Sequence, residues 1–179
     1  MKEKYVDLHL HTTASDGTFT PTELVTQAKK LGFSTIAITD HDTVAGLEEG
    51  FTAAEKNSVD LIPAIELNTD YEGTEVHVLG YYIDYQDQKI LDKLASLKEG
   101  RYNRIKKIVE KLNNLGMEIK FEEVADLADG AALGRPHVAR VMLEKGYVNE
   151  WTQAFDRYIG RDAPAYVERT KLTPKEAIQ

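Results

Sequence analysis

Short apolar runs alternate with stretches of helical periodicity over the first 85 residues, which is typical of an α/β fold. Residues 5–8 form a brief apolar stretch and residues 34–39 a β-branched one, and each predicts a buried strand. Between them, Thr20 and Glu23 have the spacing of a capping box with Pro21 as the first helical residue. The apolar positions that follow share one helical face: Leu24, Val25, Ala28 and Leu31. This order predicts parallel strands whose C-terminal ends meet at one edge of the sheet.

The alternation continues to about residue 83 and then stops. A second helix is predicted over residues 44–56 and a third strand over residues 60–68. A fourth strand, over residues 75–83, follows a turn at residues 71–74. From residue 87 to residue 145 the apolar spacing is helical throughout, so no strand is predicted there.

These patterns divide the chain into three predicted parts. Residues 1–86 hold the strands, residues 87–170 form an all-helical insertion, and residues 171–179 begin a returning segment. Thr173 and Glu176 repeat the capping-box spacing, so a helix is expected to start there and to continue past Gln179.

Composition limits the chemistry that this chain can carry. Its 179 residues are 42% hydrophobic, which suits a globular protein with a sizeable core, and none is cysteine. A metal ion would therefore need imidazole and carboxylate ligands. The net charge of −8 argues against binding to long nucleic-acid duplexes, although bound cations could still attract an anionic substrate. Neither a membrane span of roughly 18 apolar residues nor a secretory signal is found, so a cytoplasmic protein without membrane contact is expected.

Candidate metal ligands gather at the predicted strands. A His-x-His pair such as His9 and His11 can place two imidazoles on one side of a strand, because strand side chains alternate. A single strand-end histidine is more often a hydrogen-bonded core residue, but the shared placement of four favours a site for zinc, manganese or iron. The histidines are His9, His11, His41 and His77, and the acidic residues among them are Asp7, Asp16, Asp40, Asp42 and Glu66.

Two motifs in this region resemble those of a known family. Residues 7–18 read DLHLHTTASDGT and residues 38–43 read ITDHDT. Glu66 and His77 follow later in the chain, at spacings similar to those of the family's next two motifs. Together they resemble the metal motifs of phosphoesterases with a polymerase-and-histidinol-phosphatase (PHP) domain. The resemblance covers nearly all of the first 80 residues.

The resemblance implies a distorted α/β barrel with a helical insertion and up to three metal ions at its C-terminal face. Manganese is the first expectation, with zinc or iron as alternatives. The implied ligands are His9, His11 and Glu66 for one ion, Glu66 and His77 for a second, and Asp16 and His41 for a third. Asp40 would either orient one of these ligands or only cap its strand.

The family pattern also includes later ligands, which are a histidine in a His-Pro step and an Asp-x-His near the C-terminus. Neither occurs before Gln179. Four strands are too few for a barrel, which typically takes about 250 residues. We therefore expect the N-terminal half of a PHP-type barrel, truncated before the barrel closes.

Basic residues in the helical part are candidates for substrate binding. Arg101 and Arg104 are three residues apart within a basic run and could clamp a phosphate, or could belong to a solvated helix face. Arg135 and His137 flank Pro136 at a helix start, where free N–H groups also attract anions. The segment around them, together with Asp16 and Gly17, most resembles a branch that dephosphorylates nucleoside 3',5'-bisphosphates and trims short RNA from its 5' end.

We therefore expect a phosphoesterase that hydrolyses nucleotides or short oligonucleotides with a metal-activated water and no covalent nucleophile. The alternative enzyme is a small-molecule phosphatase of the histidinol-phosphate type. A hypothesis of a different class is a metal-binding module without catalysis. The sequence leaves the oligomeric state open.

Overall fold

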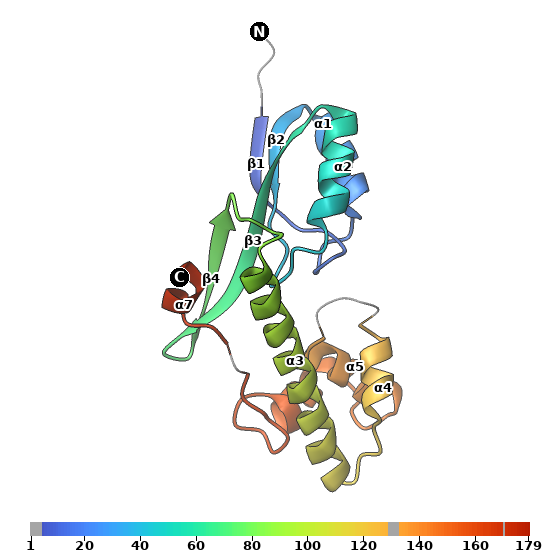
Figure 1. Ribbon diagram of the computed structural model, residues 1–179. Helices are drawn as coiled ribbons and strands as arrows, with labels where there is room; N and C mark the ends of the chain where they lie inside the picture. Colours follow the sequence, from blue (N-terminus) through green and yellow to red (C-terminus); the bar gives the residue numbers. More distant parts are fainter. Residues whose placement is uncertain (1–4, 129–132, 170) are drawn as a thin grey trace. The chain divides into compact units, whose positions relative to one another are not determined.

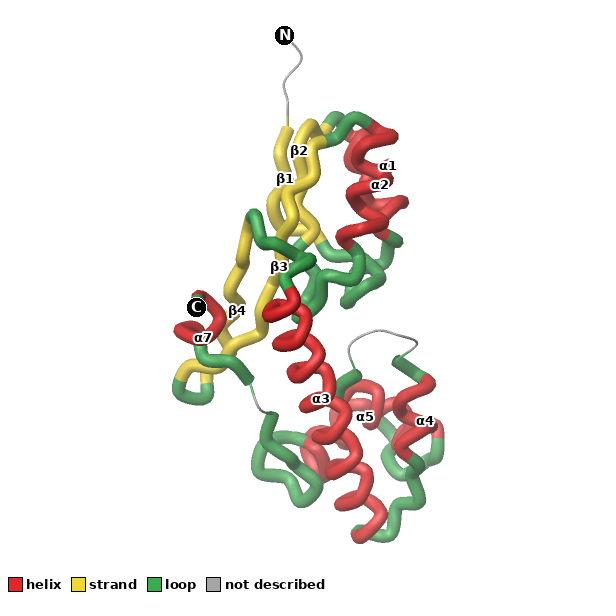
Figure 2. Tube along the Cα trace, in the orientation of Figure 1, coloured by secondary structure: helices red, strands yellow, loops and turns green. Residues whose placement is uncertain are grey.

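The structure is a computed structural model that describes residues 5–128, 133–169 and 171–179. The chain divides into two compact units, Met1–Ala95 with Lys171–Gln179, and Ser96–Thr170. Figure 2 shows that the strands belong to the first unit, and that the described part of the second consists of helices and loops. The units divide within a helix, between Ala95 and Ser96, whereas the predicted border at residue 86 precedes that helix.

The first unit is built on a four-stranded sheet (Figure 1). The strands, in spatial order, are β1 (Tyr5–Leu10), β2 (Phe33–Ile38), β3 (Asp60–Tyr71) and β4 (Thr74–Tyr81). The first three run parallel, and β4 returns antiparallel along β3 after a tight turn. β3 is longer than predicted because its first residues pair with β2 and its later residues pair with β4. The predicted α/β class and the parallel order of the first three strands are confirmed.

Two helices cover one face of this sheet (Figure 1). They are α1 (Pro21–Leu31) and α2 (Leu47–Asn57), which pack against each other and against β2 and β3. α2 starts three residues later than predicted, at Leu47. Their apolar faces form a core with the sheet, whose fully or nearly fully buried members include Val25, Ala28, Ile36, Ala53, Ala54 and Val59. Burial of these side chains is the main force that holds the helices on the sheet.

The capping box at the start of α1 forms as predicted. Thr20 Oγ1 accepts a hydrogen bond from the Glu23 backbone N–H, and the Glu23 carboxylate accepts from the Thr20 backbone N–H. We expect Thr20→Ala to lower the free energy of unfolding by about 1 kcal/mol, because a helix N–H loses its partner. Urea unfolding measures this change. The matched control is Thr26→Ala within the same helix, and an equal loss in both variants would contradict a capping effect.

Residues 5–8 form a strand as predicted, but the prediction that this strand is buried is wrong. β1 is an edge strand, and Tyr5, Val6 and Leu8 are each exposed by 40% or more. An apolar run predicts a strand, but whether a neighbour covers that strand depends on the rest of the fold. β2 lies inside the sheet, and its Ile36, Ala37 and Ile38 are fully buried as predicted.

The second unit contains a helical core of its own. It is formed by most of α3 (Gln88–Asn114) with α4 (Phe121–Asp126), α5 (Arg135–Glu144), α6 (Trp151–Ala154) and the π-helical turn η1 (Phe155–Ile159). Ile105, Ile108, Leu112, Val138 and Met142 are at most 1% exposed in this core. No helix within the described ranges is both long and apolar enough to cross a membrane.

The last residues rejoin the first unit. Leu172 forms a bridge with Thr69 of β3, and its carbonyl accepts a hydrogen bond from the Asp70 N–H at 2.8 Å. The short helix α7 (Pro174–Ile178) follows, with the predicted capping box between Thr173 and Glu176. The segment after the helical unit is therefore tied to β3 by backbone hydrogen bonds.

Candidate metal centre

The six predicted metal ligands lie together in the first unit. His9 is in β1, His11 and Asp16 are in the loop after β1, His41 follows β2, Glu66 is in β3 and His77 is in β4. Parallel pairing brings His41 to Glu66, because these two residues form a bridge just beyond the end of β2. His77 is brought to the same strand by the antiparallel pairing of β4 with β3. The backbone on either side of this bridge is also fixed, since Asp42 N–H donates to the Glu66 carbonyl and Glu66 N–H to the Asp40 carbonyl.

Glu66 is the centre of this group, and its side chain is only 4% exposed. Its Oε2 lies 2.8 Å from Nε2 of His9, 3.2 Å from Nε2 of His11 and 3.6 Å from Nδ1 of His41. Its Oε1 lies 2.5 Å from Nδ1 of His77. A single buried carboxylate thus faces four imidazoles, and this set of nitrogen and oxygen donors suits a divalent transition metal.

Ligand atoms of these side chains form three overlapping groups, each within 4.8 Å: His9, His11 and Glu66; His11, Asp16 and His41; and His41, Glu66 and His77. The groups contain the ligand sets that the family resemblance implies, and they add His11 to the Asp16 group and His41 to the His77 group. Within the described chain, buried Nδ1 of His11 has no hydrogen-bond partner, and Asp16 Oδ1 is 3.6 Å away. A buried nitrogen without a partner is costly, so a cation at this point fits the site.

The electrostatics of the centre favour the metal-binding forms of Glu66 and His41. Burial alone would raise the pKa of Glu66, but hydrogen bonds from His9 and His77 outweigh burial and hold that pKa below its usual value. Burial lowers the pKa of His41, and the nearby carboxylates of Glu66 and Asp16 only partly offset this effect. At neutral pH, Glu66 is therefore ionised and His41 is neutral, as metal ligation requires.

The loop that carries Asp16 is held by Asp40. This aspartate is 1% exposed, and its carboxylate accepts hydrogen bonds from Thr12 N at 2.7 Å, Thr12 Oγ1 at 2.7 Å and Ser15 Oγ at 2.6 Å. The loop also folds tightly on itself, because a Cβ on Gly17 would lie 2.4 Å from the His11 carbonyl oxygen. The contacts of Asp40 thus position the loop, whereas the sequence suggested a ligand-orienting role or a plain strand cap.

Side chains on β3 and β4 also contact ring nitrogens of His41 and His77. Asn68 Nδ2 lies 3.4 Å from Nδ1 of His41 and donates to Asp42 Oδ2 at 3.1 Å. Glu75 Oε1 lies 3.1 Å from Nε2 of His77. A hydrogen bond from Lys171 and a second from His77 lower the pKa of Glu75 to about 2. Burial lowers the pKa of His77, but hydrogen bonds to Glu75 and Glu66 raise it more, so the net shift is upward.

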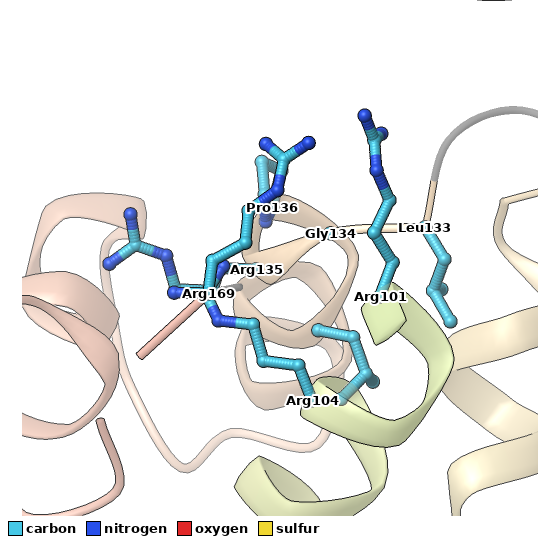
Figure 3. A pocket seen from close by; sticks show the side chains of 8 residues that line it. Arg101, Arg104, Leu133, Gly134, Arg135, Pro136 and Arg169 are labelled. Atoms are coloured by element: carbon cyan, nitrogen blue, oxygen red, sulfur yellow. The ribbon is translucent and has the colours of Figure 1, made fainter. Parts of the chain in front are cut away.

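A basic pocket lies in the second unit (Figure 3). It has a volume of about 170 Å³, and four half-buried arginines line it: Arg101, Arg104, Arg135 and Arg169. Arg104 Nε donates to the Val167 carbonyl at 2.7 Å, and the Arg104 and Arg135 guanidinium groups lie over the Tyr166 ring. These contacts hold the guanidinium groups of Arg104 and Arg135 in fixed directions.

Burial and mutual repulsion act on these arginines together. Burial, with repulsion from Arg169, lowers the pKa of Arg101 to about 10. Burial, with repulsion from Arg135 and Arg169, lowers the pKa of Arg104 to about 10 as well. Arg101 and Arg104 stay protonated at neutral pH, so an anion bound in the pocket would relieve the repulsion between the guanidinium groups.

His137 is not one of the described residues that line this pocket. Its Nδ1 accepts a hydrogen bond from the Gly134 N–H at 3.1 Å, which closes the start of α5. A substrate contact by His137 stays a prediction.

Three residues around these sites were not identified from the sequence. Glu75 precedes His77 by two positions and therefore shares its face of β4, so the alternation of strand side chains could have identified it. Arg169 and Lys171 have no such signal. Each reaches its site only through the folding of segments far apart in the sequence.

Comparison with known proteins identifies relatives whose names refer to RNA or to nucleotides as substrates. A 5'-3' exoribonuclease of Haemophilus influenzae is 39% identical over 168 residues, which cover 94% of this chain and 61% of that protein. A 3',5'-nucleoside bisphosphate phosphatase of Chromobacterium violaceum is 29% identical over 174 residues, which cover 97% of this chain and 61% of that protein. This chain thus spans about three fifths of the length of these curated relatives.

A solved structure and a family model agree with these relatives. A protein from Bifidobacterium adolescentis, assigned as a metal-dependent phosphoesterase, is 31% identical with a TM-score of 0.76. The match covers 98% of this chain and 62% of that one. The model of the PHP domain matches residues 7–161, which is well over half of the chain. The chain therefore belongs to the PHP domain family.

Proposed function

We propose that this protein is a metal-dependent phosphoesterase that hydrolyses phosphate esters of nucleotides or short oligonucleotides. The observation that carries the proposal is the buried Glu66 carboxylate with four imidazoles around it. Glu66 would bridge two ions, one shared with His9 and His11 and one shared with His77. Asp16 and His41 would hold a third ion, and manganese is the metal we propose first.

Divalent cations at this centre would activate a water molecule and neutralise charge on the phosphate oxygens during hydrolysis. The protein's own residues keep the donor atoms in place. Asp40 fixes the loop of His11 and Asp16, and the bridge between His41 and Glu66 fixes those two side chains relative to each other. Such preorganisation lowers the cost of gathering several charges around a phosphate.

The basic pocket of the second unit supports an anionic substrate. Arg101 and Arg135 are the proposed contacts there, with Arg104 and Arg169 completing the cationic lining. One guanidinium group can bind two phosphate oxygens at once, and the contacts that hold Arg104 and Arg135 reduce the entropy lost on binding. The names of the two curated relatives support nucleotides or RNA as the class of substrate.

The test uses purified full-length protein with added Mn²⁺. We expect release of inorganic phosphate from a nucleoside 3',5'-bisphosphate, and shortening of a 5'-phosphorylated RNA oligonucleotide would extend the activity to RNA. Turnover of histidinol phosphate without turnover of the bisphosphate would replace the substrate that we propose. Absence of any phosphoester hydrolysis by the Mn²⁺-loaded protein would overturn the proposed function and favour a metal-binding module.

Arginine variants extend the same assay to the basic pocket. Arg101→Gln and Arg135→Gln should each raise KM for the bisphosphate about 10- to 100-fold, because a hydrogen bond to a charged group contributes about 1.5–3 kcal/mol. Hydrolysis of p-nitrophenyl phosphate, which carries one phosphate, should change far less. The matched control is Arg140→Gln, since Arg140 is exposed on the same helix as Arg135 and pairs with Glu144. Equal losses on both substrates would contradict a role of the pocket in recognising the substrate.

A further inference from the structure

The outer side of His77 is held by a chain of charged groups that the proposed metal sets do not include. His77 Nδ1 faces Glu66, while Nε2 on the opposite side of the ring lies 3.1 Å from Glu75 Oε1. The other carboxylate oxygen of Glu75 accepts a hydrogen bond from Lys171 Nζ at 2.5 Å. The Lys171 side chain is only 12% exposed. The order Glu66, His77, Glu75, Lys171 therefore runs outward from the centre.

We propose that Glu75, fixed by Lys171, is a positioning residue that directs Nδ1 of His77 toward the metal centre. The inference rests on the proposed function, because it assigns His77 to a metal ion. A histidine ligand that donates its second ring N–H to a carboxylate has its tautomer and ring orientation fixed, and it binds the metal more strongly. Glu75 is placed for this role since it occupies the face of β4 that carries His77.

Lys171 gives the arrangement rigidity that an exposed carboxylate would lack. The Glu75 side chain is 54% exposed, so alone it could adopt several rotamers. The backbone next to Lys171 is anchored, because Leu172 forms a bridge with Thr69 and its carbonyl accepts from Asp70 N–H. The ammonium group therefore approaches Glu75 from a fixed point. The orientation of His77 thereby depends on the segment that returns from the helical unit to the sheet.

The test compares zinc binding by full-length wild-type protein, Glu75→Ala, Glu75→Gln and Lys171→Met, using competition with a chelating dye. We expect Glu75→Ala to weaken one zinc site about 10- to 100-fold and to leave the sites that do not use His77 unchanged. Glutamine keeps an oxygen that can accept from Nε2–H, so Glu75→Gln should restore part of the affinity. Lys171→Met should cause a smaller loss, and this loss should disappear in the Glu75→Ala background because the two residues act in series.

A second readout separates positioning from general stability. In the zinc-loaded wild-type protein, long-range ¹H–¹⁵N NMR of the histidine rings should show His77 protonated at Nε2 and unprotonated at Nδ1. Glu75→Ala should lose this uniform tautomer without a matching loss of thermal stability. The controls are Glu55→Ala on the exposed side of α2 and Lys175→Met on α7, and both should behave like wild type.

The outcomes distinguish this inference from the proposed function. Glu75→Ala protein that binds zinc as tightly as Glu55→Ala, with the His77 tautomer unchanged, would overturn the positioning role. Wild-type protein that binds zinc in the Glu75-dependent manner but hydrolyses no phosphoester would overturn the proposed function and leave the inference standing. Wild-type protein that takes up no zinc would overturn the inference, whereas the proposed function would still be decided by the Mn²⁺ assay.

Discussion

A Glu66→Gln variant should lose most of its bound metal and hydrolyse phosphate esters about 10³-fold more slowly than the wild-type protein. The wild-type carboxylate faces four imidazoles, and in the proposal its two oxygens serve two different ions. Glutamine has nearly the same volume but carries no charge, and its NH₂ group would point at a cation or at a ring N–H. Metal ions contribute several kcal/mol of charge stabilisation to such reactions, which corresponds to about three factors of ten in rate.

Metal content after dialysis, measured by mass spectrometry, and kcat/KM for a nucleoside 3',5'-bisphosphate check this expectation. Glu55→Gln is the matched control, because Glu55 is an exposed residue of α2 in the same unit. It should keep both metal and activity. A Glu66→Gln protein that retained its full metal content and most of its activity would contradict the central role of this carboxylate.

Local rules of sequence predicted the elements that depend on nearby residues. The capping box at Thr20 and Glu23 fixed the start of α1, and the left-handed Gly32 with φ of 88° ends it. The turn before β4 has Gly73 with a positive φ, as its sequence indicated. Family membership adds that the mixed sheet is part of a PHP-type α/β barrel, which agrees with the predicted fold class.

Burial and long-range contacts were harder to predict. The apolar residues of β1 predicted a strand correctly but did not predict that it would be exposed. Exposure depends on which elements lie beside the strand. The candidate ligands that follow β1 and β2 could be grouped from the sequence, since parallel strands bring their C-terminal ends together. His77 joins them through the antiparallel pairing of β4 with β3. Arg169 and Lys171 could not be grouped from the sequence, because no periodicity relates them to Arg101 or Glu75, and only the path of the chain back from the helical unit brings them there.

The sequence marked Asp40 as a candidate because it precedes His41, but it did not predict the contacts that Asp40 makes. Its position beside His41 suggested a partner for that histidine or a strand cap. The structure instead directs its carboxylate to the backbone and hydroxyl of Thr12 and to the hydroxyl of Ser15. All three residues are at most 5% exposed. The loop they fix carries His11 and Asp16, so Asp40 links the end of β2 to two candidate ligands from the end of β1.

Asp40→Ala should therefore lower the free energy of unfolding by about 3 kcal/mol or more, because three buried donors lose their acceptor and each unsatisfied group costs about 1–3 kcal/mol. Asp40→Asn should lose much less. Its Oδ1 can still accept from Thr12 N–H and Ser15 O–H, and only the contact with Thr12 Oγ1 must be rearranged. Urea unfolding of the metal-free proteins measures both changes. Asp70→Ala is the control, since the Asp70 carboxylate accepts a hydrogen bond from Gly73 N–H in an exposed turn.

Asp40→Ala should also weaken metal binding more at some positions of the centre than at others. Release of the loop moves Asp16 and His11, whereas Glu66 and His77 stay on paired strands. Manganese titration of Asp40→Ala protein that is still folded should then show the weakest binding at the Asp16 and His41 position, with the Glu66 and His77 position least affected. A uniform loss at every position would instead indicate that the whole unit had loosened. An Asp40→Ala protein as stable as Asp70→Ala, with unchanged manganese binding, would mean that the loop is held by its own backbone hydrogen bonds, such as Gly17 N–H to the Thr12 carbonyl.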